Sequence, residues 1–219
     1  DSFNPFLGYP NQNKIGDYIT IVSDNTGGNV AYAATFNQEE DIYYVRVAPA
    51  SNAVTLMSAA SRLTHGATGT FDIAMPLTGT PGVEDRSSIT YNAVFTFSGS
   101  VTSGTVMVAS GVATTGTPTF SGSTLTVPLT GVANAQNVTL QLSNINGDSN
   151  PNDGAVPFSF LIGDTTGDGA VNAGDIGQTK SQSGNAVTGS NFREDVTIDG
   201  SINAGDIGLV KSKSGTGLP

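Results

Sequence analysis

Two twelve-residue stretches of the chain share one acidic pattern: DTTGDGAVNAGD at residues 164–175 and DVTIDGSINAGD at residues 195–206. In both, side chains that carry oxygen stand at positions 1, 3, 5, 9 and 12, and a glycine stands at position 6. A chain that turns sharply at the sixth residue can gather these oxygens, with the carbonyl of position 7, around one point. The spacing therefore predicts a site for a hard cation in each stretch.

The expected ligands are of the same kind in both stretches. In the first loop they are Asp164, Thr166, Asp168, the Ala170 carbonyl, Asn172 and Asp175. In the second loop they are Asp195, Thr197, Asp199, the Ser201 carbonyl, Asn203 and Asp206. Three carboxylates per loop favour Ca²⁺ over Mg²⁺, which demands a tight octahedron and retains its waters. Two bound ions would change the formal charge from −10 to −6, because each adds +2. The alternative is a pair of Asp/Gly turns that bind no metal.

A third acidic turn has a simpler explanation. The loop NGDSNPND at residues 146–153 contains Asp148, Asn150 and Asp153, whose oxygens could hold a third Ca²⁺. Asn and Asp side chains also stabilise ordinary turns by bonding to nearby backbone groups. We favour the ordinary turn.

The remaining titratable residues form no pattern that is typical of an enzyme. The single histidine, His65, has no nucleophile signature such as GxSxG in the sequence, so we expect it to be structural or exposed. Glu84, Asp85 and Arg86 are consecutive, and neighbouring side chains in a strand or turn point apart. We expect them to form a solvated ion pair, and we expect no catalytic activity.

Composition excludes several functional classes. The net charge of −10 argues against binding to nucleic acid or to anionic membranes. The chain has no cysteine and one histidine, which excludes Cys/His zinc sites, disulfides and a thiol nucleophile. The sequence contains no run of 18 apolar residues, so we expect no transmembrane helix. The chain begins at Asp1 without an initiator Met or a signal-peptide pattern, as we expect of a processed form.

The hydrophobic pattern predicts a mainly β fold in three parts. Residues 1–50 contain an aromatic, proline-rich arm (1–16) and three alternating segments that predict a β-meander. Residues 51–162 contain six short segments with one apolar face each, which indicate an antiparallel β-sandwich. Residues 50–66 show no clear pattern and suggest a short helix or a loop. Alternation stops at Gly163, so residues 163–219 are predicted to be a small, partly helical calcium module.

The two acidic loops, each followed by a short helix-like segment (DIGQTKSQSG and DIGLVKSKSG), resemble a dockerin. The resemblance covers roughly residues 163–219. It implies two Ca²⁺ ions, an extracellular bacterial location and a cohesin-like protein partner. Two features differ from the usual dockerin pattern. Position 3 is Thr in both loops, and positions 10 and 11 are Ala-Gly where a cohesin-contacting hydroxyl is common.

A second resemblance concerns the N-terminal part. The segment IGDYITIVSDNTGGNVAYAATFNQEEDIYYVRVAP is similar to the last blade of sialidase-like β-propellers. The segments SRLTHGATGTFDIAMPLTGTPGVEDR and NAQNVTLQLSNING resemble C-terminal regions of large secreted bacterial proteins. Only one blade is present, so this resemblance implies no glycosidase active site.

Two functional hypotheses follow. The first is a non-catalytic, extracellular, calcium-binding assembly protein that attaches to a cohesin-like domain or to copies of itself, with the arm adding to the next subunit in a head-to-tail filament. The second is a carbohydrate-binding ancillary region of a secreted sialidase-like glycoside hydrolase. Carbohydrate platforms usually need exposed aromatic side chains, and the chain has no Trp and only 6 Tyr.

Overall fold

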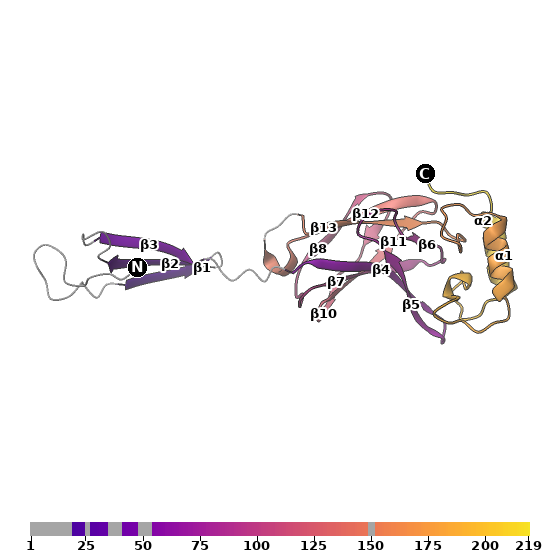
Figure 1. Ribbon diagram of the computed structural model, residues 1–219, viewed down its shortest axis with the longest axis horizontal. Coiled ribbons are helices and arrows are strands. Elements are labelled where there is room, and N and C mark those ends of the chain that lie inside the picture. Colours follow the sequence, from indigo (N-terminus) through magenta and orange to yellow (C-terminus); the bar gives the residue numbers. More distant parts are fainter. Residues whose placement is uncertain (1–18, 25–26, 35–40, 48–53, 149–151) are drawn as a thin grey trace, which may run out of the picture. The chain divides into compact units, whose positions relative to one another are not determined.

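The computed structural model describes residues 19–24, 27–34, 41–47, 54–148 and 152–219. The predicted arm at residues 1–16 and the third-site residue Asn150 lie outside the described residues. The chain divides into two compact units, Asp1–Asn52 and Ala53–Pro219. The described fold is mainly antiparallel β, with two α-helices near the C-terminus (Figure 1).

The first unit contains the predicted meander. Strands β1 (Ile19–Asp24), β2 (Gly27–Ala34) and β3 (Asp41–Val47) form an antiparallel sheet in the order β1-β2-β3. The pairing places Ile21 opposite Val30, and Val30 opposite Val45, so apolar side chains share one face. Several of the large apolar side chains of this sheet are exposed, including Ile19, Ile21, Ile42 and Tyr44.

The second unit contains two sheets. Its strands are β4 (Leu56–His65), β5 (Gly69–Met75), β6 (Val83–Glu84), β7 (Thr90–Phe97), β8 (Thr105–Ser110), β9 (Thr114–Thr115), β10 (Thr119–Ser121), β11 (Thr124–Thr130), β12 (Gln136–Ser143) and β13 (Gly154–Phe160). Six strands form one sheet in the order β10-β11-β7-β4-β5, with β9 beside β11, and four form the other in the order β6-β13-β12-β8. The pair β6–β13 is parallel. We call these ten strands the two-sheet body.

The inward faces of the two sheets share one hydrophobic core, as the alternation predicts. Phe95 of β7 meets Phe158 of β13 edge to face, with ring centroids 6.1 Å apart. The predicted inward residues of β11 and β12 are fully buried: Leu125, Val127, Leu129, Val138, Leu140 and Leu142. Because successive side chains in a strand point to opposite faces, the residues between the buried ones of β12 are polar: Asn137, Thr139 and Gln141.

The expectation of a helix or loop at residues 50–66 is wrong for most of the segment, because β4 spans Leu56–His65. Its inward residues do alternate, but only one of them is a large apolar residue: Ala59, Ser61, Leu63 and His65, with relative exposures of 5%, 1%, 4% and 0%. A strand that buries Ser and His shows little hydrophobic alternation, so the pattern does not reveal it.

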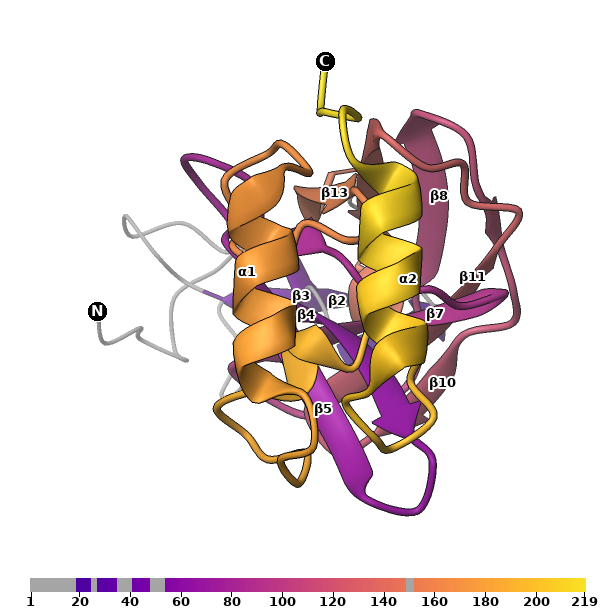
Figure 2. The same ribbon diagram turned by 90° about the vertical axis from the view of Figure 1, so that its right-hand side faces the viewer.

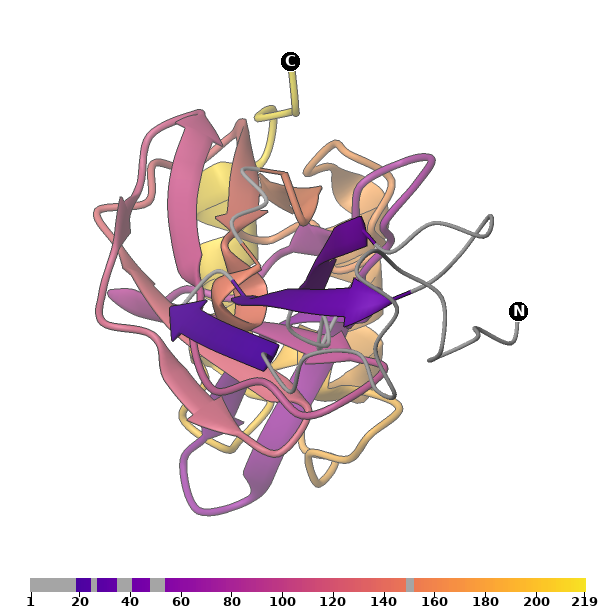
Figure 3. The ribbon, with the colours of Figure 1, turned by 90° about the vertical axis from the view of Figure 1, so that its left-hand side faces the viewer.

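The C-terminal segment contains helices α1 (Ala173–Gln182) and α2 (Ala204–Lys213), which lie side by side (Figure 2). Seen from the opposite direction, the helices lie behind the strands of the two-sheet body (Figure 3). Short 3-10 helices span Ile145–Gly147 (η1) and Phe192–Glu194 (η2). Neither α-helix in the described part has the length and hydropathy that a membrane span requires.

A second, smaller hydrophobic cluster joins the helices to the body. It consists of five buried residues, Val83, Leu161, Val171, Val196 and Val210. Burial of so few apolar side chains provides little of the free energy needed to order two loops and two helices.

The shared core makes a stability prediction. Leu140→Ala should lower the free energy of unfolding by about 2–5 kcal/mol, because it leaves a cavity between the sheets. Met107→Ala, at a side chain that is 55% exposed, is the matched control and should change it by about 0.5 kcal/mol or less. Urea unfolding of the full chain measures both. Equal losses would show that the two sheets do not share the core described.

Candidate metal centre

The first loop is organised around the buried carboxylate of Asp164. Its Oδ1 accepts hydrogen bonds from the backbone N–H groups of Gly167 and Asp168 at 2.8 and 3.1 Å. Its Oδ2 accepts from the N–H of Gly169 at 2.8 Å. Gly167 and Gly169 have φ of 74° and 88°, so the backbone wraps around the carboxylate at positions that favour glycine.

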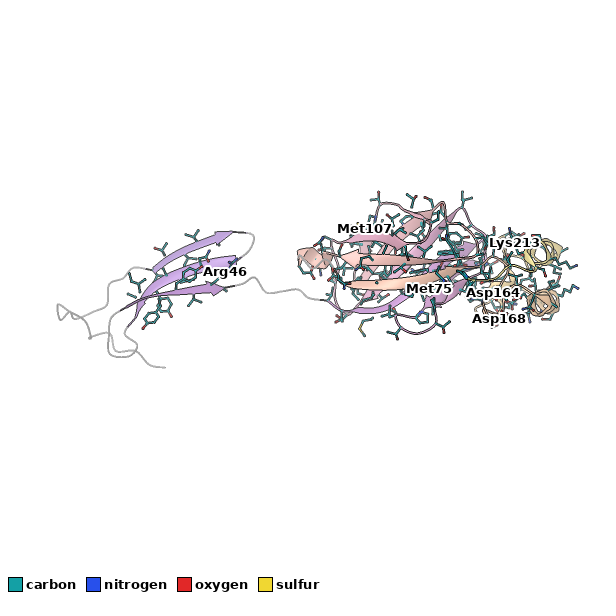
Figure 4. The ribbon with its side chains drawn as sticks, turned by 90° about the horizontal axis from the view of Figure 1, so that it is seen from above. Arg46, Met75, Met107, Asp164, Asp168 and Lys213 are labelled. Atoms are coloured by element: carbon teal, nitrogen blue, oxygen red, sulfur yellow. The ribbon has the colours of Figure 1, made fainter. Side chains whose placement is uncertain are left out.

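Positions 1, 3 and 12 of the first loop come together. The Thr166 hydroxyl lies 3.3 Å from Asp164 Oδ1 and 2.9 Å from Asp175 Oδ1. Asp175 is fully buried, and its Oδ1 also accepts from the Thr166 N–H at 3.0 Å. Figure 4 shows Asp164 and Asp168 at the end of the sheets that adjoins the helices. The buried carboxylates of Asp164 and Asp175 thus both lie next to the Thr166 hydroxyl.

The second loop repeats this framework. Asp195 Oδ1 accepts from the Asp199 N–H at 3.2 Å, and Oδ2 accepts from the Gly200 N–H at 2.9 Å. The Thr197 hydroxyl donates to Asp206 Oδ1 at 2.8 Å. Asp195 and Asp206 are both fully buried. Positions 3 and 12 therefore contact each other in both copies, and in the first copy position 3 also contacts position 1.

Position 5 has the same environment in both loops. Asp168 Oδ1 accepts from the Ala170 N–H at 3.0 Å, and Asp199 Oδ1 accepts from the Ser201 N–H at 2.8 Å. Each pair joins position 5 to position 7, whose carbonyl is a predicted ligand. Positions 5 and 7 are therefore held next to each other in each loop.

Position 9 begins each helix. Asn172 Oδ1 accepts from the Gly174 N–H, and Asn203 Oδ1 accepts from the Gly205 N–H, at 2.7 and 2.6 Å. Both residues are N-caps of a capping box, with the carboxylate of position 12 bonded back to the N-cap N–H. The ninth position of such loops often contacts the cation through a water molecule, and a side-chain oxygen that caps the helix is compatible with that role. Direct ligation by these two residues stays a prediction.

The side chains that contact one another in the loops fit a hard cation, because the carboxylates of position 12 and the hydroxyls of position 3 present oxygen ligands. The amide oxygens of position 9 and the carbonyls of position 7 stay predicted ligands. The described residues contain no group of three or more His, Cys, Asp or Glu side chains arranged as a metal cluster. Burial raises the pKa of Asp164, against the backbone N–H bonds that lower it, and the Asp175 charge raises it further. A cation in the loop would offset this cost of burying two carboxylates together.

The turn between β4 and β5 packs directly on the second loop. The Gly66 N–H donates to the Ile198 carbonyl at 2.9 Å, and the Thr68 hydroxyl donates to the Gly200 carbonyl at 3.2 Å. A Cβ on Gly66 would lie 2.3 Å from the Asp199 carbonyl oxygen, so only glycine permits this approach. The two-sheet body is thus in backbone contact with the second loop.

His65 connects the body to the first ligand of the second loop. Its Nδ1 lies 2.8 Å from Asp195 Oδ2, and both side chains are fully buried. Its Nε2 lies 3.2 Å from Arg86 Nη1. A guanidinium has only donors, so Nε2 accepts and the proton is on Nδ1, from where it is donated to Asp195. Both ring nitrogens are engaged, which gives His65 a structural role.

The expectation of a solvated ion pair at residues 84–86 is wrong, because Glu84, Asp85 and Arg86 are all fully buried. Arg86 Nε and Nη2 donate to the two oxygens of Glu84 at 2.8 and 2.7 Å. Arg86 also donates to the carbonyls of Ser61 and Phe71, and the Ser61 hydroxyl donates to Glu84. The C-terminal segment covers this turn, and a contact so distant in sequence leaves no local signal.

Arg193 performs a similar role next to the first loop. It donates to the carbonyls of Val83, Asp164 and Thr165 at 3.2, 2.9 and 3.2 Å. Its Nη2 also lies 3.1 Å from Asp85 Oδ1, although neither carboxylate oxygen of Asp85 has a hydrogen bond. The sequence did not lead us to expect a structural role for Arg193. The one sequence feature that could have indicated it is a basic residue two positions before the second loop, where the first copy has Ile162.

The predicted third site gains no support from its geometry. Asp153 Oδ2 accepts from the Ile145 N–H at 2.9 Å, as an ordinary turn residue does. Asn150 lies outside the described residues, so metal binding there stays a prediction.

An open cleft of about 550 Å³ lies between the two-sheet body and the first loop. Its polar lining includes Asp72, Thr166, Gln178 and Arg193, and Phe192 provides an aromatic surface. Phe192 stacks on Phe71 of β5 with ring centroids 5.1 Å apart. The Asp72 carboxylate forms a two-point ion pair with Arg62.

The buried Asp85 makes a pH prediction. Burial raises its pKa well above the usual range, although the Arg193 charge lowers it. Since the folded state then takes up a proton more readily than the unfolded state, the free energy of unfolding should increase as the pH falls from 7 to about 5. Asp85→Asn should reduce this increase, while Asp164 and Glu194, whose pKa values burial also raises, retain part of it. Urea unfolding in the presence of a chelator at pH 7 and at about pH 5 measures the free energy of unfolding. An equal change with pH in Asp85→Asn and in the unsubstituted protein would contradict the prediction.

Comparison with models of protein families, with curated proteins and with solved structures finds no match to the chain. The resemblances to a dockerin and to a propeller blade therefore stay predictions from the sequence motifs. The functional interpretation rests on the geometry of the two loops.

Proposed function

We propose that the chain is a non-catalytic, extracellular, calcium-binding structural protein, in which a β-sandwich carries a dockerin-like module that binds two Ca²⁺ ions. One observation carries the proposal. The two loops, which differ at several residues, share the hydrogen bonds formed at positions 3, 5, 9 and 12, and in both loops the first carboxylate accepts from the N–H groups of positions 5 and 6. Two Asp/Gly turns that bind no metal would not be expected to share these hydrogen bonds.

Calcium would supply the cohesion that the module lacks. Its hydrophobic cluster is small, and each helix contains a glycine whose neighbourhood is open, Gly177 and Gly208. Glycine within a helix costs about 1 kcal/mol relative to alanine. A cation that binds only the folded loop stabilises that loop by mass action. The metal would thus replace part of a core.

Attachment to a protein partner is the role that we assign to the module. The outward side of the helix pair is solvent-exposed and includes Lys180 and Lys211. A cohesin-like domain is one partner class, and another copy of the chain is the other. Exposed apolar side chains on the β1–β3 sheet, such as Ile21 and Ile42 at 67% and 83%, favour self-association.

The calcium proposal makes a quantitative prediction. Titration calorimetry should find two Ca²⁺ ions per chain, and Asp168→Ala and Asp199→Ala should each remove one. At a free Ca²⁺ concentration of about 100 times Kd, each site should stabilise the fold by about 2.7 kcal/mol. Asp148→Ala is the control and should keep both ions, whereas loss of an ion in that variant would establish the third site. Melting curves that do not change with chelator would refute the proposal.

The cleft beside Phe192 favours one alternative, a carbohydrate-binding ancillary region. Polar side chains around an aromatic surface are the elements from which sugar sites are built. A glycan array probed with the full chain and with Phe192→Ala separates the two functions. Binding that the variant loses supports the alternative, and absence of binding leaves the assembly role.

A further inference from the structure

The two loops differ in where the donors to their first carboxylate come from. Every hydrogen bond that the structure gives to the Asp164 carboxylate comes from its own loop, from Thr166, Gly167, Asp168 and Gly169. One of the hydrogen bonds to the Asp195 carboxylate comes from His65 on β4, 130 positions away in the sequence. The second loop is therefore completed by a residue of the two-sheet body.

Position 4 of the loops explains why this donor is needed. In the first loop, the Gly167 N–H reaches the carboxylate of Asp164. In the second loop, position 4 is Ile198, and among the described residues its N–H bonds only to the Asp195 carbonyl, at 3.1 Å. Asp195 thus lacks a backbone donor that Asp164 has on Oδ1, and its carboxylate accepts instead the His65 Nδ1–H on Oδ2.

Like Gly167 at the same position of the first loop, whose φ is 74°, Ile198 has a left-handed backbone conformation. Its φ is 57°, a left-handed value that is rare for a β-branched residue and costs on the order of 1–3 kcal/mol. Its side chain packs against the core of the two-sheet body, and its carbonyl accepts the Gly66 N–H. The loop therefore gives up a favourable residue at position 4 to make contact with the body.

We propose that His65 is a positioning residue for the second metal loop, which makes calcium binding there and docking onto the two-sheet body one linked equilibrium. The first loop binds without this coupling. This inference rests on the proposed function, since it names the residue that controls one of the two calcium sites.

The surrounding contacts fix the orientation that this role requires. Arg86 donates to His65 Nε2, and Glu84 holds Arg86 through two hydrogen bonds. The imidazole therefore keeps its proton on Nδ1. Within the described ranges, Asp195 Oδ2 then receives two donors, His65 and Gly200, while Oδ1 accepts only the longer bond from Asp199. Oδ1 is the oxygen that retains capacity for a cation.

The test uses two substitutions that differ in where they place an amide. In His65→Asn the amide nitrogen lies near the Nδ1 position and can donate to Asp195. In His65→Gln it lies near the Nε2 position, towards Arg86, and cannot. Each is combined with Asp168→Ala, which leaves the second loop intact, and with Asp199→Ala, which leaves the first loop intact.

Calcium affinity is measured for each double variant by competition with a chromophoric chelator. His65→Gln should weaken the second loop about ten- to a hundredfold, the effect of a lost hydrogen bond to a charged group. His65→Asn should restore most of that affinity. Neither should change the first loop by more than about twofold. Equal weakening of both loops, or no weakening of the second, would overturn the inference.

The single histidine of the chain provides a second readout that needs no bound calcium. In ¹⁵N spectra of the chelated wild-type protein, the His65 ring should be neutral with its proton on Nδ1. A proton on Nε2 would overturn the inference even if His65→Gln fails to fold. Absence of calcium binding in the wild type would instead refute the proposed function, so the two failures are distinguishable.

Discussion

The hydrogen bond between His65 and Asp195 is the contact on which the arrangement of the C-terminal segment depends. Both side chains are fully buried, so the Asp195 carboxylate has exchanged water for fixed donors. Burying a carboxylate is costly unless such donors surround it. The histidine can serve because Arg86 holds its other nitrogen, and Arg86 can be buried because Glu84 neutralises it. The order of the second loop therefore follows from a chain of polar contacts that begins inside the two-sheet body.

This network is a means of specificity more than of stability. Removing ions from water costs several kcal/mol each, and their mutual attraction offsets that cost only when every donor and acceptor is satisfied. Glu84 and Arg86 meet this condition, whereas the Asp85 carboxylate has only an imperfectly aligned contact with Arg193. Apolar packing could stabilise the same interface without such geometry. The hydrogen bonds of a polar network, by contrast, are all formed in only one position of the loops on the body, and any other position leaves buried polar groups without partners.

Sequence reasoning predicted the parts of this molecule that depend on local pattern. The alternation of β7 and β11 to β13 indicated which side chains enter the core, because strand periodicity is a property of neighbouring residues. The spacing of the oxygen-bearing residues in the two loops was recognised in the same way, and their role as metal ligands stays a prediction. Strand β4 was not predicted because its inward face includes Ser61 and His65. The burial of these two polar side chains is explained by their hydrogen-bond partners, Glu84 and Asp195. No local pattern reports a partner 130 residues away, and the left-handed Ile198 is equally invisible until its contact with the body is known.

The duplication makes the difference between the loops informative. Two copies that began with the same spacing retain the same hydrogen bonds at positions 3, 5, 9 and 12, so those contacts belong to the loop itself. Position 4 is left-handed in both copies, with φ of 74° at Gly167 and 57° at Ile198, so the copies differ there in residue type and not in conformation. A β-branched residue is strained in this conformation, and the contacts that compensate for the strain at Ile198 come from the two-sheet body. Among the described residues, the first carboxylate of the first loop therefore accepts hydrogen bonds from its own loop, whereas that of the second loop also accepts one from a permanent neighbour. The neighbour that the structure identifies for the second loop is the chain's own two-sheet body, and the outward side of the helix pair, which includes Lys180 and Lys211, is solvent-exposed.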